Sequence, residues 1–538
     1  MNTKSTPKPS RRFWKSWLAG SLLLLGSARA DSLGGTAPKI RAVVIDRQSV
    51  FSREQEDFWL FRWANRLHMR TKEAVVQREL LLQPEETYDS SLAKETERNL
   101  RSLGLFGSVS VTSHYVSDSA VDLLVETTDQ WSTEGTFSFG GGGGAYEFSL
   151  GLEEKNLLGW GQQLELLYEE SDLQVGRRGS LYERRIFSKP VSLWVVGESR
   201  SDGEYYSVEA GRPLYSSKDR WGANVRLFSF SGPLRFFDAG EELFSFRQTT
   251  REAGMSLLRS WGRSFKTNVN VGYLITQNRF EAKLADVADA RIRYGYILPE
   301  ERVHAFSTGV TWYANRYWEE SHLDNFGIVE DVRRGETFSL EYVLAPKFLG
   351  SSLTRQELAL SVGTTCKAGR HFLRFSAGNR TTFLPDGWEG TFWQGGVRYY
   401  WRWGTHQTAA LRFDLSAING LSRFGQFLLG GESGLRGYEA RSFSGSRMVL
   451  GTMEQRIFGP RFFSLFGLGG ALFADLGEAW KTGEDFRSGK LKSNWGIGLR
   501  VGLLRSSQFK VLRFDWARPF GRGDWVFSFG TGMSFKLE

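Results

Sequence analysis

One arginine and one aspartate stand out because of the residues around them. Arg436 lies in the glycine-rich stretch 427–438, which reads FLLGGESGLRGY, and Asp475 lies in the apolar stretch 473–480, which reads FADLGEAW. Glycine has no side chain, so the backbone of such a stretch can run close to a wall of the protein. A guanidinium placed there needs an acceptor, because a buried unpaired charge is unfavourable. These residues predict an ion pair that fastens a loop; an arginine exposed on an external loop is the alternative.

The other reactive residues show no catalytic or metal-binding pattern. The sequence contains no G-x-S-x-G motif, and its only cysteine, Cys366, excludes an internal disulfide. The glycine run 140–144 does not predict a phosphate-binding loop, because no Lys-Ser/Thr follows it and no helix begins there. We expect no cofactor, no metal and no enzymatic activity; a hydrolase whose catalytic residues lie far apart in the sequence is the alternative. The histidines are scattered over the chain: His68, His114, His304, His322, His371 and His406.

The N-terminal stretch has the features of an export signal. Several lysines and arginines come first, a short apolar stretch at 17–25 follows, and Ala28-Arg-Ala30 precedes Asp31. A membrane-spanning helix needs about 20 apolar residues, more than this stretch holds. Residues 1–30 are therefore predicted to be a Sec-type signal peptide that is cleaved after Ala30.

Composition narrows the class of the mature chain. The chain holds 69 Lys and Arg against 60 Asp and Glu; the leader holds six of the basic residues and no acidic one, which leaves 63 against 60, a net charge of +3. A basic nucleic-acid-binding protein is not supported, and we expect no nucleic acid partner. The chain has 61 Gly, 19 Trp and 41 Phe but only 12 Pro, a bias typical of large antiparallel sheets with aromatic girdles.

Residues 40–130 mix helix and strand. Strands are predicted at 40–45, 106–111 and 120–125, and apolar residues recur at helical spacing between Phe58 and Leu82. A second helix follows from Thr87, with Gly104 as its left-handed C-terminal cap. The order strand–helix–helix–strand–strand predicts a small α+β domain.

From about residue 134 the period changes to two. The segments 409–415 and 525–535 alternate apolar or aromatic residues with polar ones, and candidate strands are near ten residues long, which suits a tilted bilayer crossing. Arg513 and Asp515 would then face a polar lumen. No later apolar run is long enough for a membrane-spanning helix, so the prediction is a transmembrane antiparallel β-barrel of about 16 strands; a periplasmic all-β protein is the alternative.

The ends of the chain predict the topology. The α+β domain precedes the barrel in an exported chain and should lie in the periplasm, and an even strand number returns the C-terminus to that side. Long polar connections would then be mostly extracellular: about 279–302, 315–335, 380–392, 416–446 and 476–492. Short connections at 187–190 and 345–347 suit periplasmic turns.

The pattern LGGxxxLRGY at 429–438, followed by FxDxG at 473–477, resembles the BamA/TamA superfamily of outer-membrane assembly and translocation proteins, also known as the bacterial surface antigen family. In that family the loop tip tucks into the barrel and its arginine contacts the aspartate of the wall, a structural and gating role. The resemblance assigns the tip to Leu435, Arg436, Gly437 and Tyr438, and the wall partner to Phe473, Asp475 and Gly477.

The stretch 99–111, NLRSLGLFGSVSV, resembles the family's POTRA domain. The resemblance implies a signal peptide at 1–30, one POTRA-like periplasmic domain at 31–130 and an outer-membrane β-barrel at 131–538. Two departures limit it: dedicated assembly machines typically carry several POTRA domains, and the C-terminus lacks the terminal aromatic residue common in outer-membrane proteins.

The glycines of the first and last strand candidates predict a weak barrel seam. Glycine contributes no side-chain packing to a strand, so a first–last pairing of this kind could open sideways to lipid and expose edges that template an incoming strand. A flexible turn at 140–144 is the alternative. The seam residues are predicted to be Gly140, Gly141, Gly142, Gly530, Gly532 and Phe535.

These features predict a protein of the outer membrane of a Gram-negative-type bacterium that inserts, assembles or translocates other proteins. Its partners would be unfolded outer-membrane or secreted client proteins and the lipid bilayer, with periplasmic chaperones or accessory lipoproteins as further candidates. A two-partner-type secretion pore for a dedicated exoprotein, and a passive outer-membrane pore, are the alternatives.

Overall fold

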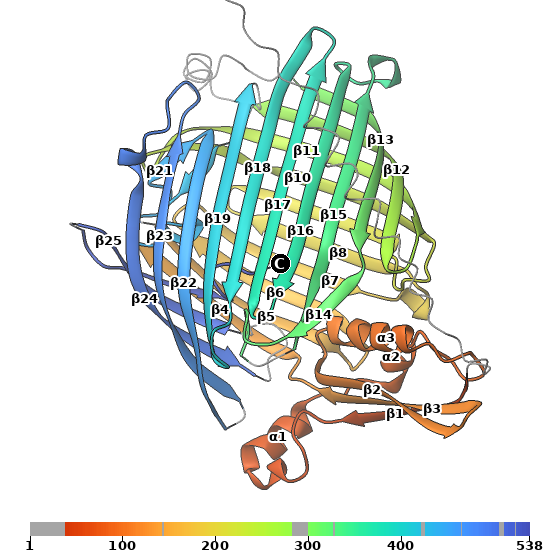
Figure 1. Ribbon diagram of the computed structural model, residues 1–538. Coiled ribbons are helices and arrows are strands. Elements are labelled where there is room, and N and C mark those ends of the chain that lie inside the picture. The colour runs from red at the N-terminus through yellow and green to blue at the C-terminus, as the bar shows by residue number, and fades with distance from the viewer. Residues whose placement is uncertain are drawn as a thin grey trace, which may run out of the picture.

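A small α/β unit precedes a large closed sheet (Figure 1). The computed structural model describes residues 38–142, 145–281, 300–326, 329–420, 426–463, 465–504, 511–521 and 523–537. The predicted signal peptide, residues 1–30, lies outside the described residues. No helix in the part of the chain that the structure describes has the length and apolar character needed to cross a membrane.

The N-terminal unit is a three-stranded sheet in the order β1-β3-β2, with β1 parallel and β2 antiparallel to β3. Its strand–helix–helix–strand–strand order agrees with the sequence, but the helical stretch 58–82 is divided into two short helices. Thr71 lies between them and donates its backbone N–H to the Asp129 carboxylate at 2.8 Å, so this stretch is hydrogen-bonded outside a helix. The elements are β1 (Lys39–Gln48), η1 (Gln55–Asp57), α1 (Trp59–Leu67), α2 (Glu73–Gln77), α3 (Ser90–Ser102), β2 (Phe106–Ser117) and β3 (Ala120–Asp129).

Helix α3 shows how the local sequence builds this unit. Asp89 caps its N-terminus, since the Asp89 carboxylate accepts the backbone N–H of Ser91 at 2.9 Å. Gly104 follows the helix at φ 69°, the left-handed conformation predicted for it. The buried face of α3 is formed by Leu92, Ala93, Thr96 and Leu100.

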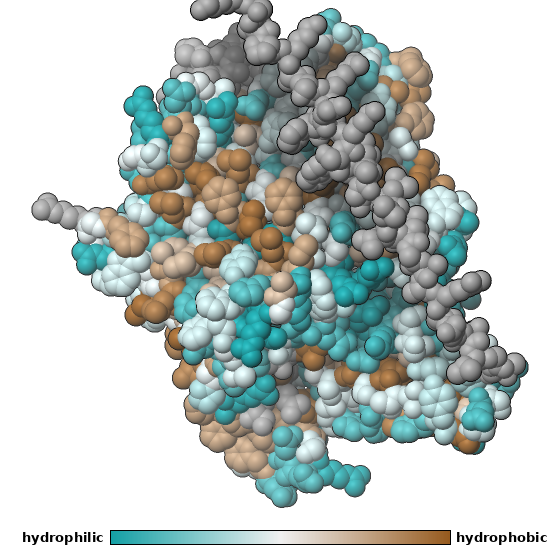
Figure 2. Space-filling model, in the orientation of Figure 1, coloured by the Kyte–Doolittle hydropathy of each residue, from teal (hydrophilic) through white to brown (hydrophobic). Residues whose placement is uncertain are grey.

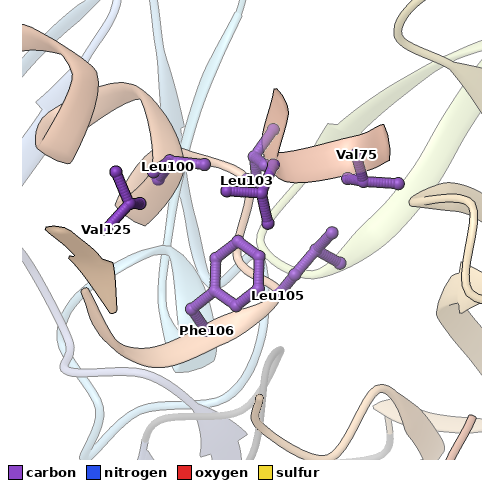
Figure 3. Packing of buried hydrophobic residues seen from close by; sticks show 7 residues of the cluster. Val75, Leu100, Leu103, Leu105, Phe106 and Val125 are labelled. Atoms are coloured by element: carbon purple, nitrogen blue, oxygen red, sulfur yellow. The ribbon is translucent and has the colours of Figure 1, made fainter. Parts of the chain in front are cut away.

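The core of the N-terminal unit lies between the helices and the sheet. Figure 3 shows Val75 of α2 and Leu100 of α3 converging with Phe106 of β2 and Val125 of β3. Helix α1 contributes no residue to this cluster or to the second cluster around Ile40. The unit therefore has its own core, and α1 is an attachment to it.

The rest of the described chain forms a closed antiparallel barrel of 21 strand segments. Two of them, β13 and β14, pair one after the other with the same partner, β15, so the wall is 20 strands wide. The predicted number, about 16, was too low, because strands such as β6 to β9 are short and closely connected and do not separate clearly in the sequence. The barrel strands are β4 (Thr133–Gly142), β5 (Ala145–Leu157), β6 (Gln162–Ser171), β7 (Val175–Glu183), β8 (Ser192–Arg200), β9 (Gly203–Arg212), β10 (Trp221–Asp238), β11 (Glu241–Trp261), β12 (Phe265–Glu281), β13 (Glu301–Ala314), β14 (Arg316–Glu320), β15 (Glu330–Ala345), β16 (Arg355–Ala368), β17 (His371–Leu384), β18 (Gly387–Trp401), β19 (Gln407–Gly420), β22 (Arg447–Phe462), β23 (Phe466–Trp480), β24 (Lys492–Leu503), β25 (Val511–Pro519) and β26 (Val526–Thr531).

The two faces of the barrel wall differ as the alternation predicts. In β19, Leu411, Phe413 and Leu415 are exposed on the outside. Arg412 and Asp414, which alternate with them, are ion-paired with each other, and Asp414 also accepts a hydrogen bond from Arg398 of β18 at 2.6 Å. An apolar exterior and a charged interior are the arrangement of a membrane barrel and the inverse of a soluble sandwich.

Two connections lie at the opposite end of the barrel from the end that the sequence predicted. The stretch 315–335 was expected to be extracellular, yet β14 and the turn after it lie at the end that faces the N-terminal unit (Figure 1). The connection at 345–347, expected to be a periplasmic turn, follows β15 at the far end. Both differences have one cause. β14 and the start of β15 extend beyond the barrel as a two-stranded ribbon, and the polar sequence of this ribbon resembles the sequence of an external loop.

The N-terminal unit is fastened to one end of the barrel by buried and half-buried ion pairs. Arg101 of α3 donates from Nε and Nη2 to the two carboxylate oxygens of Asp331 at 3.1 and 2.9 Å. Arg185, in the turn between β7 and β8, makes a similar two-point contact with the fully buried Glu79 at 2.8 and 3.1 Å. Paired guanidinium–carboxylate contacts of this kind fix orientation as well as distance.

Candidate functional site

The loop between β19 and β22 lies inside the barrel. Its described part contains β20 (Phe427–Leu429), η4 (Gly431–Ser433) and β21 (Phe443–Gly445), and β20 pairs only with β21 among the described strands. Leu435 of the predicted tip is fully buried and packs in a cluster with Leu429 and with Leu450 of β22. The loop therefore forms a small folded unit that is packed against the inner face of the wall.

Glycines allow the tip to approach the wall closely. A Cβ atom at Gly437 would lie 2.6 Å from Cβ of Asn494, closer than two such atoms can approach, and 3.0 Å from the backbone carbon of Arg518, a tight contact. Tyr438, the next residue, donates its hydroxyl to the backbone oxygen of Ser493 at 3.1 Å. The backbone at Gly437 is in direct contact with β24 and β25. A side chain at this position would push the loop tip away from both strands.

Gly437→Ala should therefore displace the tip from β24. The added methyl group meets backbone as well as the Asn494 side chain, so the neighbouring atoms cannot yield cheaply. We expect faster amide hydrogen exchange over 426–445, measured by mass spectrometry of the purified protein. Gly489→Ala is the matched control, because a Cβ atom at Gly489 would meet nothing within 4 Å. Equal exchange in the two variants would contradict the close packing of the tip.

Arg436 is held by three carboxylates at once. Its Nε and Nη2 atoms donate to Asp475 at 3.0 and 2.9 Å, and its Nη1 atom donates to Glu454 at 2.8 Å and to Asp515 at 3.0 Å. The guanidinium carbon lies 3.5 Å from the centre of the Phe473 ring, a cation–π contact. With only 4% of its side chain exposed, Arg436 is a buried cation whose donors all have partners on the barrel wall.

The three carboxylates belong to a larger network of alternating charges. Arg500 donates to Asp515 at 2.6 Å, and Arg456 donates to Glu454 at 3.0 Å and to Asp324 at 2.7 Å. In total the network contains Arg436, Arg456, Arg500 and Arg513 against Asp324, Glu454, Asp475 and Asp515, so its formal charges balance. Buried charges are tolerated in a folded protein when each of them is paired. Loss of one member of this network would leave its partners buried and unpaired, so its ion pairs depend on one another.

The structure brings together the residues that the sequence singled out. Asp475 contacts Arg436 through both carboxylate oxygens and also accepts the Asn494 amide at 2.9 Å. A Cβ atom at Gly477 would lie 2.9 Å from the Val449 backbone oxygen, so this glycine lets β23 and β22 approach. Sequence reasoning did not find Glu454 as a partner of Arg436. Its alternation with apolar residues in β22 indicates a lumen-facing position, but only the pairing register places it beside the loop.

The predicted seam glycines lie in strands. Gly140, Gly141 and Gly142 belong to β4 and pair with β5, so the alternative of a flexible turn is wrong for these three; residues 143–144 lie outside the described part of the chain. Gly530 belongs to β26, where a Cβ atom would lie 2.7 Å from Nη2 of Arg513. The absence of a side chain at Gly530 therefore makes room for a guanidinium of the charge network.

The alternation of 525–535 predicted that Gly532 and Phe535 continue the last strand. In the structure they do not. β26 ends at Thr531, and Gly532 has φ 77°, a left-handed conformation that turns the chain inward. The buried Phe535 side chain packs against the Tyr400 ring, and its backbone oxygen accepts the Arg456 Nη2 donor at 2.8 Å. The C-terminal segment 532–537 is thus a lumen segment rather than part of the seam.

The histidines form no metal centre in the part of the chain that the structure describes. His322 and His406 come within 5.2 Å of each other, measured between ring centres, although the sequence separates them widely. The described residues contain no group of three His, Cys, Asp or Glu side chains that could hold a metal ion.

Residues 372–535 match the family model described as the Omp85 superfamily domain. This range holds the loop, Asp475 and the charge network except for Asp324. No curated protein matches the chain closely enough to count as a relative.

Solved structures of low identity also match. BamA from Haemophilus ducreyi lacking POTRA domains 1–3 is 14% identical, with a TM-score of 0.41 over 93% of this chain and 85% of that one. CdiB from Acinetobacter baumannii is 12% identical, with a TM-score of 0.43 over 92% and 73%. CdiB from Escherichia coli is 10% identical, with a TM-score of 0.43 over 94% and 92%.

Proposed function

The chain belongs to the Omp85 superfamily through residues 372–535, and on this premise we propose that it inserts client proteins into the outer membrane or exports them across it. The membership confirms the resemblance predicted from the LRGY and FxDxG motifs. It also identifies the chain as an outer-membrane β-barrel protein of the class that transports or assembles other proteins. The choice between insertion and export, and the parts of the chain that carry it out, belong to the proposal.

The N-terminal unit, within residues 31–130, is proposed to be a single periplasmic POTRA domain that receives clients. Its sheet order leaves β1 and β2 as edge strands, and the outward backbone N–H and C=O groups of an edge strand can pair with an extended segment of another chain. At the start of β1 this edge is already occupied, because the backbone of Ile40 is hydrogen-bonded to Glu85 and Glu86. Its ion pairs with the barrel, such as Arg101 with Asp331, hold it at the barrel end. A client bound at an edge strand would lie next to that end.

The single observation that carries the proposal is the buried charge network around Arg436. A packed apolar loop would fasten the same segment without the penalty of removing charges from water. Ion pairs instead give a loop that is either fully engaged with Asp475, Glu454 and Asp515 or released as a unit. We propose that the loop tip, Leu435 to Tyr438, acts as a gate whose docked state is the one in the structure.

The seam is proposed to be the exit toward the membrane. β26 and β4 close the barrel, and β26 is six residues long, which limits their pairing to a ladder of that length. By contrast, β10 pairs with β11 over the whole of its 18 residues. Because a ladder's stability grows with the number of paired residues, both ladders of β26 are weak, since its pairing with β25 also spans only six residues. Of these two short ladders, the β26–β4 junction is the one where the last and first strands of the barrel meet, and we propose it as the exit.

The test is quantitative proteomics of the outer membrane after deletion of the gene, beside strains that carry Arg436→Ala or Arg487→Ala. We expect the deletion and Arg436→Ala to lower the amount of one or a few surface proteins. Arg487, exposed in the connection between β23 and β24, is the matched arginine and should leave them unchanged. An unchanged proteome with altered small-solute permeability would overturn the proposal in favour of a passive pore. Loss of a single secreted protein encoded beside the gene would favour a two-partner-type secretion pore.

A further inference from the structure

Helix α1 turns its most apolar side away from the protein. Trp59, Trp63 and Leu67 are 63%, 55% and 68% exposed, and their spacing of four residues places them one above another on one face. Leu60, also exposed, widens this face. Figure 2 shows brown and tan side chains gathered at the lower end of the molecule, where Figure 1 draws α1. Two tryptophans and two leucines form an apolar stripe on the outside of a small domain.

The opposite face of α1 attaches it to the domain. The Asn65 side chain accepts the backbone N–H of Phe51 at 3.1 Å and donates to its backbone oxygen at 2.8 Å. Phe61 stacks on the Phe51 ring, with centres 4.2 Å apart. Neither core cluster of the domain includes an α1 residue, so the outward direction of Trp59 and Trp63 is set by this narrow attachment.

Basic residues border the apolar stripe. Arg62 and Arg66 are exposed, lie one turn apart on the side of the stripe next to Trp59, and are the only charged residues within α1. Arg70 follows the helix and is also exposed. Of the nearby acidic residues, Glu54, Glu56 and Asp57, the Glu56 side chain accepts the Asn65 amide at 2.7 Å on the attached face of α1, and its backbone oxygen accepts Arg62 Nε at 3.1 Å. The surface that the stripe presents is thus apolar with a cationic margin.

The end of α1 is tied to the rim of the barrel. Asn156, near the turn between β5 and β6, donates its amide to the backbone oxygen of Met69 at 3.2 Å and to Oγ1 of Thr71 at 2.9 Å. Lys72 adds a backbone hydrogen bond to Gly159 at 2.9 Å. A helix of 9 residues is about 13 Å long, and Met69 follows its last residue by two positions, so the whole of α1 lies within about 20 Å of this attachment to the barrel rim. A bilayer that surrounds the first barrel strands would meet the barrel near this rim.

We propose that α1 is a membrane-interface helix that lies on the phospholipid surface next to the first strands of the barrel. Trp59, Trp63 and Leu67 would enter the boundary between headgroups and acyl chains, where the indole N–H stays hydrated. Arg62 and Arg66 would meet the phosphates of anionic headgroups, to which their charge is complementary. This interaction goes beyond the protein-handling role and needs no client.

The proposal is tested with the full-length protein reconstituted into protein-free vesicles of phosphatidylethanolamine and phosphatidylglycerol. Cys366, the only cysteine, is replaced by Ser, and a fluorescent label is attached to Leu67→Cys or to Asp118→Cys. Asp118 is exposed in the β2–β3 turn and is the matched control. We expect brominated acyl chains to quench the label at position 67 and iodide to quench it several-fold less than the label at position 118. Adding Arg62→Gln and Arg66→Gln should reduce the shielding only when phosphatidylglycerol is present.

Equal quenching of the two labels by iodide would overturn the proposal. Shielding of position 67 that appears only after an envelope protein extract is added would also overturn it, because the stripe would then bind a protein. A Trp59→Ser/Trp63→Ser variant should lose the shielding while its barrel keeps the heat-dependent gel migration of the parent. Since the measurement contains no client protein, its failure would leave the proposed assembly or export function untouched.

Discussion

Arg436→Ala is expected to release the loop between β19 and β22 from the barrel lumen. The change removes the donors that pair with Asp475, Glu454 and Asp515 and leaves three cations against four carboxylates in the buried network. Removing one partner of a buried ion pair typically costs about 3–5 kcal/mol. A change of that size raises the population of the released loop by roughly a hundred- to several-thousand-fold.

Hydrogen exchange over residues 426–445 in the purified protein measures this release directly. The parent loop should exchange slowly, and the Arg436→Ala loop should exchange at a rate near that of an open chain. Arg436→Lys should give an intermediate result, because an ammonium keeps the charge but cannot donate to Asp475 from two positions. A loop that stays as protected in Arg436→Ala as in the parent would show that apolar packing around Leu435 is sufficient to hold it.

A double substitution separates the ion pair from its surroundings. Asp475→Asn in the Arg436→Ala background removes one of the carboxylates that have lost their partner. We therefore expect the pair of changes to destabilise the loop less than the sum of the two single changes. Additive effects would mean that Asp475 and Arg436 act independently despite their contacts at 2.9 and 3.0 Å.

Truncation after Thr531 is expected to increase ion conductance through the barrel. The segment 532–537 occupies the lumen at the end that faces the N-terminal unit, where Leu537 donates its backbone N–H to Asp324 at 3.0 Å. Phe535 and Leu537 are buried with Tyr400 and Leu323 in one apolar cluster. Burying a side chain of this size contributes about 1.5–3 kcal/mol, so the segment is held firmly enough to block a path.

Single-channel recordings of refolded protein in planar bilayers test this expectation without depending on export to the membrane. The truncated barrel should show larger or longer openings than the parent. Lys536→Ala is the matched control, because Lys536 lies in the same segment but is exposed. Equal conductance in the truncated and parent proteins would mean that the lumen is closed elsewhere, with the loop around Arg436 as the next candidate.

Local features of this protein were readable from its sequence because they depend on neighbours along the chain. The alternation in β19 follows from the pleat, which sends Leu411 and Phe413 to one face and Arg412 and Asp414 to the other. The cap at Asp89 and the left-handed Gly104 follow from hydrogen bonding within a few residues. The pairing of Arg436 with Asp475 was predicted because a buried guanidinium needs an acceptor and a family motif supplied one.

Tertiary structure decided everything that depends on register and on the path of the chain between distant strands. Glu454 and Asp515 became partners of Arg436 only once the loop was placed at a particular height against β22 and β25. The inward turn at Gly532 depends on a donor, Arg456, that the sequence separates widely from the C-terminus. The exposed side of α1 was likewise invisible in the sequence, because a helical period shows that a stripe exists but not whether the protein covers it. Such contacts are set by the closure of a long sheet, which no local pattern encodes.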